Sequence, residues 1–239
     1  MNTPETTPPA PLPPPPDERF LLKPLEGPCH PFAVVEALLK HPGRILHELR
    51  GHRAAAIGAA LFLVALPCLA VYGVVAGSLS GGAQLFLAPA KILLGSALCA
   101  LICLPSLFIF LCLGGADAKL RSVAGDLLAA VSLTAILLIG FAPVAWVFSQ
   151  STDSVALMAT LHLAFWAIAL GFSLRLIGRS NGSRTSHVWI AIYVIVCLQM
   201  MTALRPIVGS GPTFLPTEKK FFLAHMVDTL TAKPVPKAP

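Results

Sequence analysis

Two polar side chains, His162 and Gln199, stand inside long apolar stretches of the sequence and could do chemistry there. If both stretches are helices, the rise of about 1.5 Å per residue places the two side chains at a similar depth. An imidazole or amide without a partner in hydrocarbon is costly. We therefore predict that His162 and Gln199 hydrogen-bond each other and join two adjacent, antiparallel helices. The alternative is a ligand site or a proton relay, which requires a polar cavity at His162.

Three charged residues lie near the ends of apolar stretches: Lys91, Asp126 and Arg175. Lys91 is expected near the outer surface, where its apolar stem lets the ammonium reach the headgroups. Asp126 precedes one stretch and Arg175 closes another, both on the inner side, so an ion pair between them is expected. As an anion at a helix start, Asp126 also suits the helix dipole.

The sequence carries no arrangement typical of catalysis or metal binding. A catalytic site needs a nucleophile or metal with a supporting base, and no stretch contains paired carboxylates or a nucleophile motif. Cys99 and Cys103 are one helical turn apart, but no histidine or second cysteine pair completes a tetrahedral set. We predict no enzymatic activity, no metal and no cofactor, and we interpret these cysteines as small packing residues.

The apolar stretches themselves predict the fold. Apolar residues make up 56% of the 239 residues and charged residues only 12%, about half the charged share of a soluble domain. Five stretches reach the roughly 20 residues that cross a bilayer: 54–77, 86–113, 127–148, 154–177 and 188–208. The sequence therefore predicts an all-α, polytopic transmembrane helical bundle of about five spans over residues 54–208, in contact with lipid.

Basic residues predict the orientation of this bundle. They gather before the first stretch and in the loops after the second and fourth, whereas the loops at 78–85 and 150–153 carry none. Basic loops lie on the cytoplasmic side, so the N-terminus is expected inside and the C-terminus outside. The formal net charge of +6 is thus an orientation signal. No basic stripe interleaved with aromatics indicates nucleic acid.

The flanking segments differ in composition from the spans. Residues 1–29 are rich in proline and predict a disordered tail. Residues 30–53 show apolar positions at helical spacing, interrupted by His41-Pro42-Gly43, and predict two short interfacial helices. The alternative is that they pack on the bundle's own loops. Residues 209–239 are expected to form a tail, with a short amphipathic helix after Thr217.

A family resemblance rests on two short segments. Gly114-Gly115 and the basic run 118–121 follow the second stretch, and the third reaches Phe141-Ala142-Pro143; His-Pro-Gly-Arg at 41–44 precedes the first. In these residues and in its layout, the chain resembles bacterial members of the Yip1 family. The resemblance implies five spans, an inside N-terminus and a non-enzymatic role. The Asp-Leu-Tyr-Gly-Pro motif of eukaryotic members is absent, so their vesicle-trafficking role does not carry over.

Two classes of function remain open. One is a membrane scaffold or assembly protein of a bacterial inner membrane, which recruits protein partners in the membrane or at the inner face. The other is a small transporter or channel subunit that uses the proline-kinked spans with His162 and Gln199. A scaffold predicts no water path past His162, and a transporter predicts one.

Overall fold

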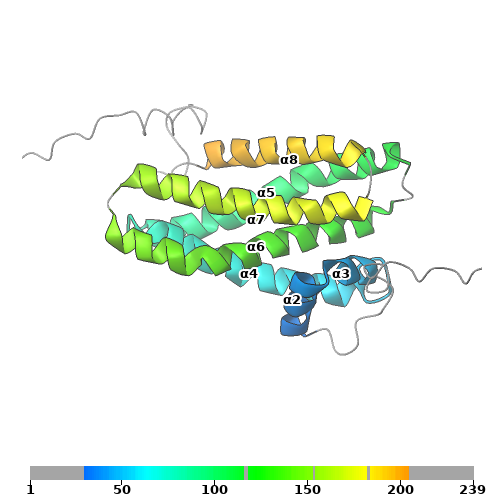
Figure 1. Cartoon of the computed structure of the whole chain (residues 1–239), viewed down its shortest axis with the longest axis horizontal. Coiled ribbons are helices and arrows are strands. Elements are labelled where there is room, and N and C mark those ends of the chain that lie inside the picture. The colour runs from blue at the N-terminus through cyan, green and yellow to red at the C-terminus, as the bar shows by residue number, and fades with distance from the viewer. Residues whose placement is uncertain (1–29, 116–117, 153, 182–183, 205–239) are drawn as a thin grey trace, which may run out of the picture.

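The computed structural model describes residues 30–115, 118–152, 154–181 and 184–204. Within these ranges five helices run side by side along one axis (Figure 1). They are α4 (Ala54–Ser78), α5 (Gln84–Leu113), α6 (Leu120–Ser151), α7 (Val155–Asn181) and α8 (Arg184–Ala203). Two short helices, α2 (Pro31–Lys40) and α3 (Pro42–Glu48), pack at the end where α4 begins. The all-α polytopic bundle is therefore confirmed.

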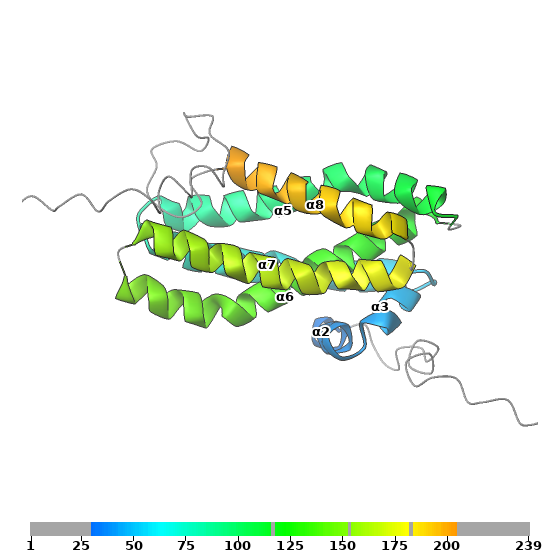
Figure 2. The same ribbon diagram turned by 45° about the horizontal axis from the view of Figure 1, so that its top comes forward.

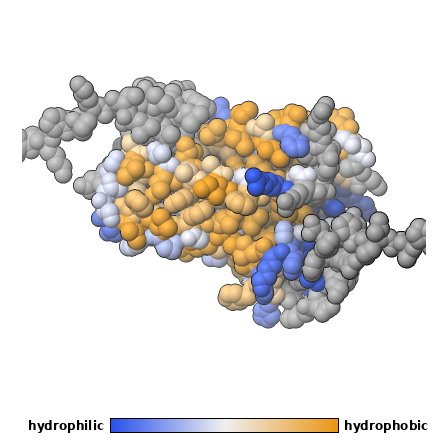
Figure 3. All heavy atoms as spheres, viewed as in Figure 1, coloured by the Kyte–Doolittle hydropathy of each residue, from blue (hydrophilic) through white to orange (hydrophobic). Residues whose placement is uncertain are grey.

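Four of the five bundle helices, α4 to α7, are long and apolar enough to cross a membrane. The apolar part of α8 is shorter, His187–Ala203, and the predicted fifth stretch continues to 208, beyond the described residues. Side chains such as Phe62, Leu63 and Leu101 stand exposed on the flanks. Figure 3 shows a largely hydrophobic face of the bundle, with hydrophilic residues toward its ends and a strongly hydrophilic patch within it. Exposed apolar surface of this kind suits lipid, and the chain is a membrane protein.

The helices do not pack in the order of the chain. α4 contacts both α5 and α6, α7 packs mainly on α6, and α8 packs mainly on α5. In a second view, α8 again runs alongside α5 (Figure 2). The predicted adjacent packing of the last two helices is therefore wrong in its main contact, because α7 and α8 touch at only a few positions.

Two glycines of α4 lie where this helix comes very close to the backbone of α5. A Cβ atom at Gly73 would overlap the backbone of Pro89, and one at Gly77 would overlap the carbonyl of Gln84. Small residues let helix backbones approach closely in membranes. These two glycines therefore set the distance between α4 and α5.

We call residues 31–49, which comprise α2, α3 and the residue after them, the platform. Each helix begins with a proline, which is favourable at the first helical position, and His41 separates them. The platform contacts α4, α6 and α7. A continuous apolar cluster joins it to the bundle: Val34, Leu38, Ile45, Leu46 and Leu49 with Ile57, Ala60, Leu61, Ala129, Leu133 and Leu176.

One side of α2 is buried against the bundle and the other is exposed. Val34 and Leu38 are buried, whereas Phe32 and Leu39 are 88% and 50% exposed. The platform thus packs on the helices of the bundle, where the alternative interpretation had expected its loops, and leaves apolar side chains on its outer face. On that face the Lys40 Nζ atom lies 2.7 Å from the Glu36 Oε1 atom. The hydrogen bond from Lys40 and its positive charge lower the pKa of the Glu36 carboxyl.

The predicted disordered tail at 1–29, the predicted amphipathic helix after Thr217 and the tail at 209–239 lie outside the described residues.

Candidate functional site

His162 lies in the bundle core, but its partner is Tyr72 rather than Gln199. The His162 Nδ1 atom on α7 is 2.7 Å from the Tyr72 hydroxyl oxygen on α4. The two rings meet edge to face at 5.4 Å between centroids, and the side chains are 5% and 0% exposed. The pair therefore joins α4 to α7 by a buried hydrogen bond.

Gln199 is exposed on the surface of α8, so the predicted His162–Gln199 hydrogen bond is wrong. Helix α8 packs on α5, and this turns Gln199 away from α7. Sequence reasoning missed Tyr72 because a tyrosine in an apolar stretch looks like an ordinary packing aromatic; its hydroxyl was the only available signal.

The surroundings of the Tyr72–His162 pair are apolar. Its neighbours belong to a buried cluster that includes Leu69, Leu138 and Phe165, and the Phe165 ring also meets the imidazole edge to face. The second imidazole nitrogen, Nε2, is buried without a hydrogen-bond partner among the described residues.

Other buried polar contacts also tie helices together. The Thr134 hydroxyl on α6 donates to the Ser173 hydroxyl on α7 at 2.8 Å. Ser132 on α6 donates to the Leu61 carbonyl on α4 at 3.2 Å. Such contacts fix which helices are neighbours and need no ligand.

A third contact of this kind links α5 and α8. The indole nitrogen of Trp189 on α8 donates to the Ser106 hydroxyl at 3.1 Å and lies 3.3 Å from the Cys103 carbonyl. Trp189 is fully buried. The α5–α8 pair therefore has its own polar anchor.

Asp126 and Arg175 do not form the predicted pair. Asp126 is 2% exposed, and its Oδ2 atom lies 3.2 Å from the Arg50 guanidinium, which follows the platform. It stands in the second turn of α6, because that helix begins at Leu120. Arg175 is exposed instead, with its guanidinium 5.6 Å from the centre of the Phe172 ring. The Arg50–Asp126 pair therefore adds a charged link between the platform and the bundle.

Lys91 is fully buried rather than exposed at the outer interface. It lies two turns inside α5, which begins at Gln84. Protein therefore covers Lys91, and the reach of its ammonium to the headgroups stays a prediction. The periodicity of one helix cannot reveal how protein covers a position from other directions.

Two of the cysteines on α5 pack against α8. Cys99 and Cys103 are buried on α5, and the Cys99 thiol contacts the Val196 carbonyl on α8 at 3.9 Å. Among the described residues, no group of three histidine, cysteine or carboxylate side chains could hold a metal ion.

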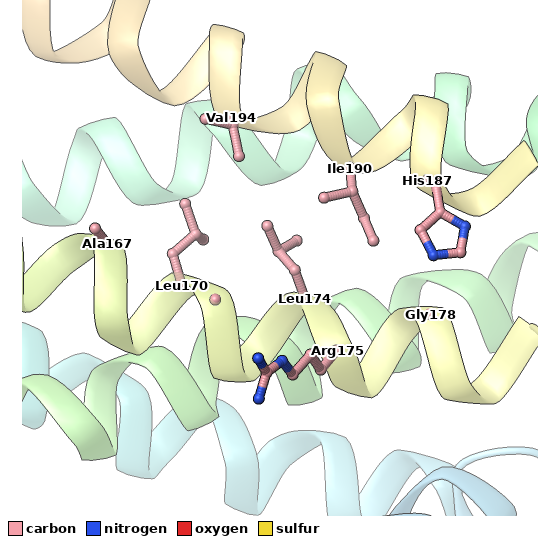
Figure 4. Close-up of a pocket in the computed structure, with 9 residues that line it drawn as sticks. Ala167, Leu170, Leu174, Arg175, Gly178, His187, Ile190 and Val194 are labelled. Carbon is pink, nitrogen blue, oxygen red and sulfur yellow. The ribbon is translucent and has the colours of Figure 1, made fainter.

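The bundle also carries a groove between α7 and α8, with a volume of about 560 Å³. Ala167, Leu170, Gly171, Leu174, Arg175 and Gly178 line it from α7, and His187, Ile190 and Val194 from α8. In Figure 4, Leu174 and Ile190 point into the gap from opposite helices, and His187 lies above Gly178. The groove forms because consecutive helices α7 and α8 diverge to pack on different neighbours.

Comparison with protein-family models, curated proteins and solved structures finds no match. The resemblance to the Yip1 family thus remains an expectation from the sequence.

Proposed function

We propose that the chain is a non-enzymatic membrane scaffold of the Yip1-like type, in the inner membrane of a bacterium. The observation that carries the proposal is the platform. Its apolar cluster and the Arg50–Asp126 pair hold it against three bundle helices. A fixed surface at one end of a bundle is suited to binding a protein partner, because little conformational freedom is lost on association.

The packing around His162 also favours a scaffold over a transporter. The imidazole sits among apolar side chains and already has a partner in Tyr72. A transported ion or proton needs a chain of polar groups or water. In this proposal the pair serves as a link between α4 and α7.

Photo-crosslinking in membranes of the native host tests the scaffold directly. A benzoyl-phenylalanine at Phe32, which is 88% exposed on the platform, should form a protein adduct of defined mass. The matched control is Leu101, which is 66% exposed on the flank of α5 and should crosslink only lipid. The same adduct pattern at both positions, or no protein adduct at Phe32, would overturn the proposal.

The proposed orientation places the platform inside the cell and the C-terminus outside. It rests on the basic loops. In a chain without its native cysteines, single cysteines should react with an impermeant reagent at outer positions and resist it at inner ones. The outer positions are Ser80 and Ser151, and the inner ones are Ser122 and Ser183. Labelling at Ser122 in intact cells would contradict this orientation and indicate the opposite one.

The second candidate, a small transporter or channel subunit, has one observation in its favour. The His162 Nε2 atom is buried without a partner among the described residues, as a proton-carrying group would be when it awaits an exchange partner. The double variant Tyr72→Phe, His162→Leu separates the two proposals. A scaffold variant should insert, fold and complement a deletion strain. A folded variant that fails to complement would favour the transporter.

A further inference from the structure

Three cysteines and a tyrosine gather at one place between α5 and α8, which run side by side (Figure 2). Cys99 and Cys103 on α5 are 3% and 1% exposed, and Tyr193 on α8 is 5% exposed. Cys197 follows Tyr193 by about one turn of α8. The Cys99 thiol lies 3.9 Å from the carbonyl oxygen of Val196, the residue before Cys197. Two distant parts of the chain therefore bring their thiols together.

Cys99 is the cysteine of α5 that meets Cys197. The two thiols lie within hydrogen-bonding reach of each other, and the Tyr193 hydroxyl lies within the same reach of the Cys197 sulfur. Cys103 acts on Cys197 only from a longer range. Its carbonyl oxygen lies 3.3 Å from the indole nitrogen of Trp189, about two turns of α8 before Cys197. The geometry therefore selects Cys99 and Cys197 as the pair.

Two thiols in contact can be joined by oxidation. Both S–H bonds break, one S–S bond forms, and two electrons and two protons pass to the oxidant. The reaction starts from a thiolate, because the thiolate is the nucleophilic form of cysteine. The Tyr193 hydroxyl can donate a hydrogen bond to the Cys197 sulfur as that thiol loses its proton.

The position of the pair defines the class of oxidant. Cys99 stands near the middle of α5, so the pair lies at the depth of the hydrocarbon. Cys197 is partly exposed, and the nearby Ile195 side chain is 60% exposed, so the pair borders the lipid. The oxidant must therefore dissolve in lipid. A quinone does so, and it accepts two electrons and two protons to become a quinol; quinones are the oxidants that maintain disulfide formation at the bacterial inner membrane.

We propose that Cys99 and Cys197 form a disulfide when a quinone in the bilayer oxidises them, and that this bond fixes α8 on α5. Trp189 already joins the two helices near the start of α8. The disulfide adds a second link about two turns further along. A bond between Cys99 and Cys103 would join α5 only to itself and would fix nothing. The proposal goes beyond the scaffold function and does not depend on it.

Counting of thiols by mass spectrometry tests the disulfide. The chain has six cysteines, so alanine at Cys29, Cys68 and Cys112 leaves three in an otherwise full-length background. Reconstituted vesicles are treated with duroquinone, a fully substituted quinone that cannot add to thiols. The protein is then denatured and labelled with N-ethylmaleimide. The labels should fall from three to one, and dithiothreitol should restore all three.

Single variants of this background identify the pair. Cys103→Ala is the matched control, one turn from Cys99 on the same helix, and its labels should fall from two to none. Cys99→Ala and Cys197→Ala should each keep both labels. Three labels in the oxidised background, or the loss of both labels in Cys99→Ala, would overturn the proposal.

Thermal unfolding of the same samples tests the link between the helices. The oxidised background should unfold several degrees above the reduced one, because a cross-link restricts the unfolded chain. Cys99→Ala should have the same Tm with and without duroquinone. A non-reducing gel checks that the oxidised protein is a monomer, so that the bond lies within one chain. An unchanged Tm in a monomer that has lost two labels would show that the bond does not fix α8 on α5.

Discussion

Because α4 and α5 approach closely at Gly73 and Gly77, we predict that alanine at either position destabilises the protein, which is the opposite of the usual effect of replacing a helical glycine. Replacing a helical glycine with alanine normally stabilises a helix by about 0.5–1 kcal/mol. At Gly73 and Gly77 the added methyl would overlap backbone atoms of Pro89 and Gln84. Backbone cannot rotate aside as a side chain can, so the helices must separate. Overpacking of this kind costs about 1–3 kcal/mol, which outweighs the gain in helix propensity.

Thermal unfolding of the full chain in detergent, followed by circular dichroism, measures the effect. For a chain of this size, 1 kcal/mol corresponds to a shift in Tm of about 2–4 °C. Gly73→Ala and Gly77→Ala should therefore lower the Tm by several degrees. Gly140→Ala and Gly171→Ala are matched controls, because an added Cβ there meets nothing within 4 Å, and they should raise the Tm slightly. If Gly73→Ala proves as stable as Gly140→Ala, the close contact does not exist in the folded protein.

Two further predictions concern the buried polar links. Tyr72→Phe or His162→Leu alone should destabilise the chain by about 0.5–2 kcal/mol, and a double-mutant cycle should give a coupling free energy between the two residues of about 0.6–1.7 kcal/mol. Gln199→Leu, at an exposed position, should show no coupling to His162. A measurable coupling of Gln199 to His162 would support the originally predicted pair. Arg50→Ala should cost about 1–3 kcal/mol, because it removes a partner of a buried carboxylate. Adding Asp126→Asn should recover part of that loss in the same unfolding assay, and a double variant less stable than Arg50→Ala would contradict the ion pair.

The number and place of the long helices could be predicted from the sequence because a bilayer imposes a simple rule on each segment separately. An uncharged stretch of about 20 residues must be a helix to satisfy its own backbone. However, this rule predicts only the apolar part of each helix. α6 begins at Leu120, seven residues before the predicted start at Leu127. Its first two turns carry Arg121 and Asp126, so the hydropathy of the sequence does not include them in the apolar stretch.

The partners of the polar residues could not be predicted, because they depend on which helices are neighbours. Equal depth suggested His162 and Gln199, and a shared interface suggested Asp126 and Arg175. Both arguments assumed that helices pack in chain order. The structure places α8 on α5 and the platform on α6, and these contacts supply Tyr72 and Arg50 as the actual partners.

The polar contacts themselves divide the bundle into two units. Among the hydrogen bonds between described helices, those of Tyr72, Ser132 and Thr134 connect α4, α6 and α7 with one another. Those of Trp189 connect α8 with α5. Within the bundle, the two units meet along the extensive interface of α4 with α5, where the glycines lie, and through two apolar clusters that include residues of α5.

This division explains where the groove lies. α7 belongs to the first unit and α8 to the second, so the short link between them joins two helices that are each held elsewhere. Apolar contacts are non-directional and tolerate small shifts between the units, whereas the hydrogen bonds within each unit do not. A change that weakens the Gly73–Pro89 contact should therefore separate the two units from each other before either unit unfolds. In Gly73→Ala, loss of the near-ultraviolet circular dichroism signal at temperatures below the loss of helical signal would reveal that step.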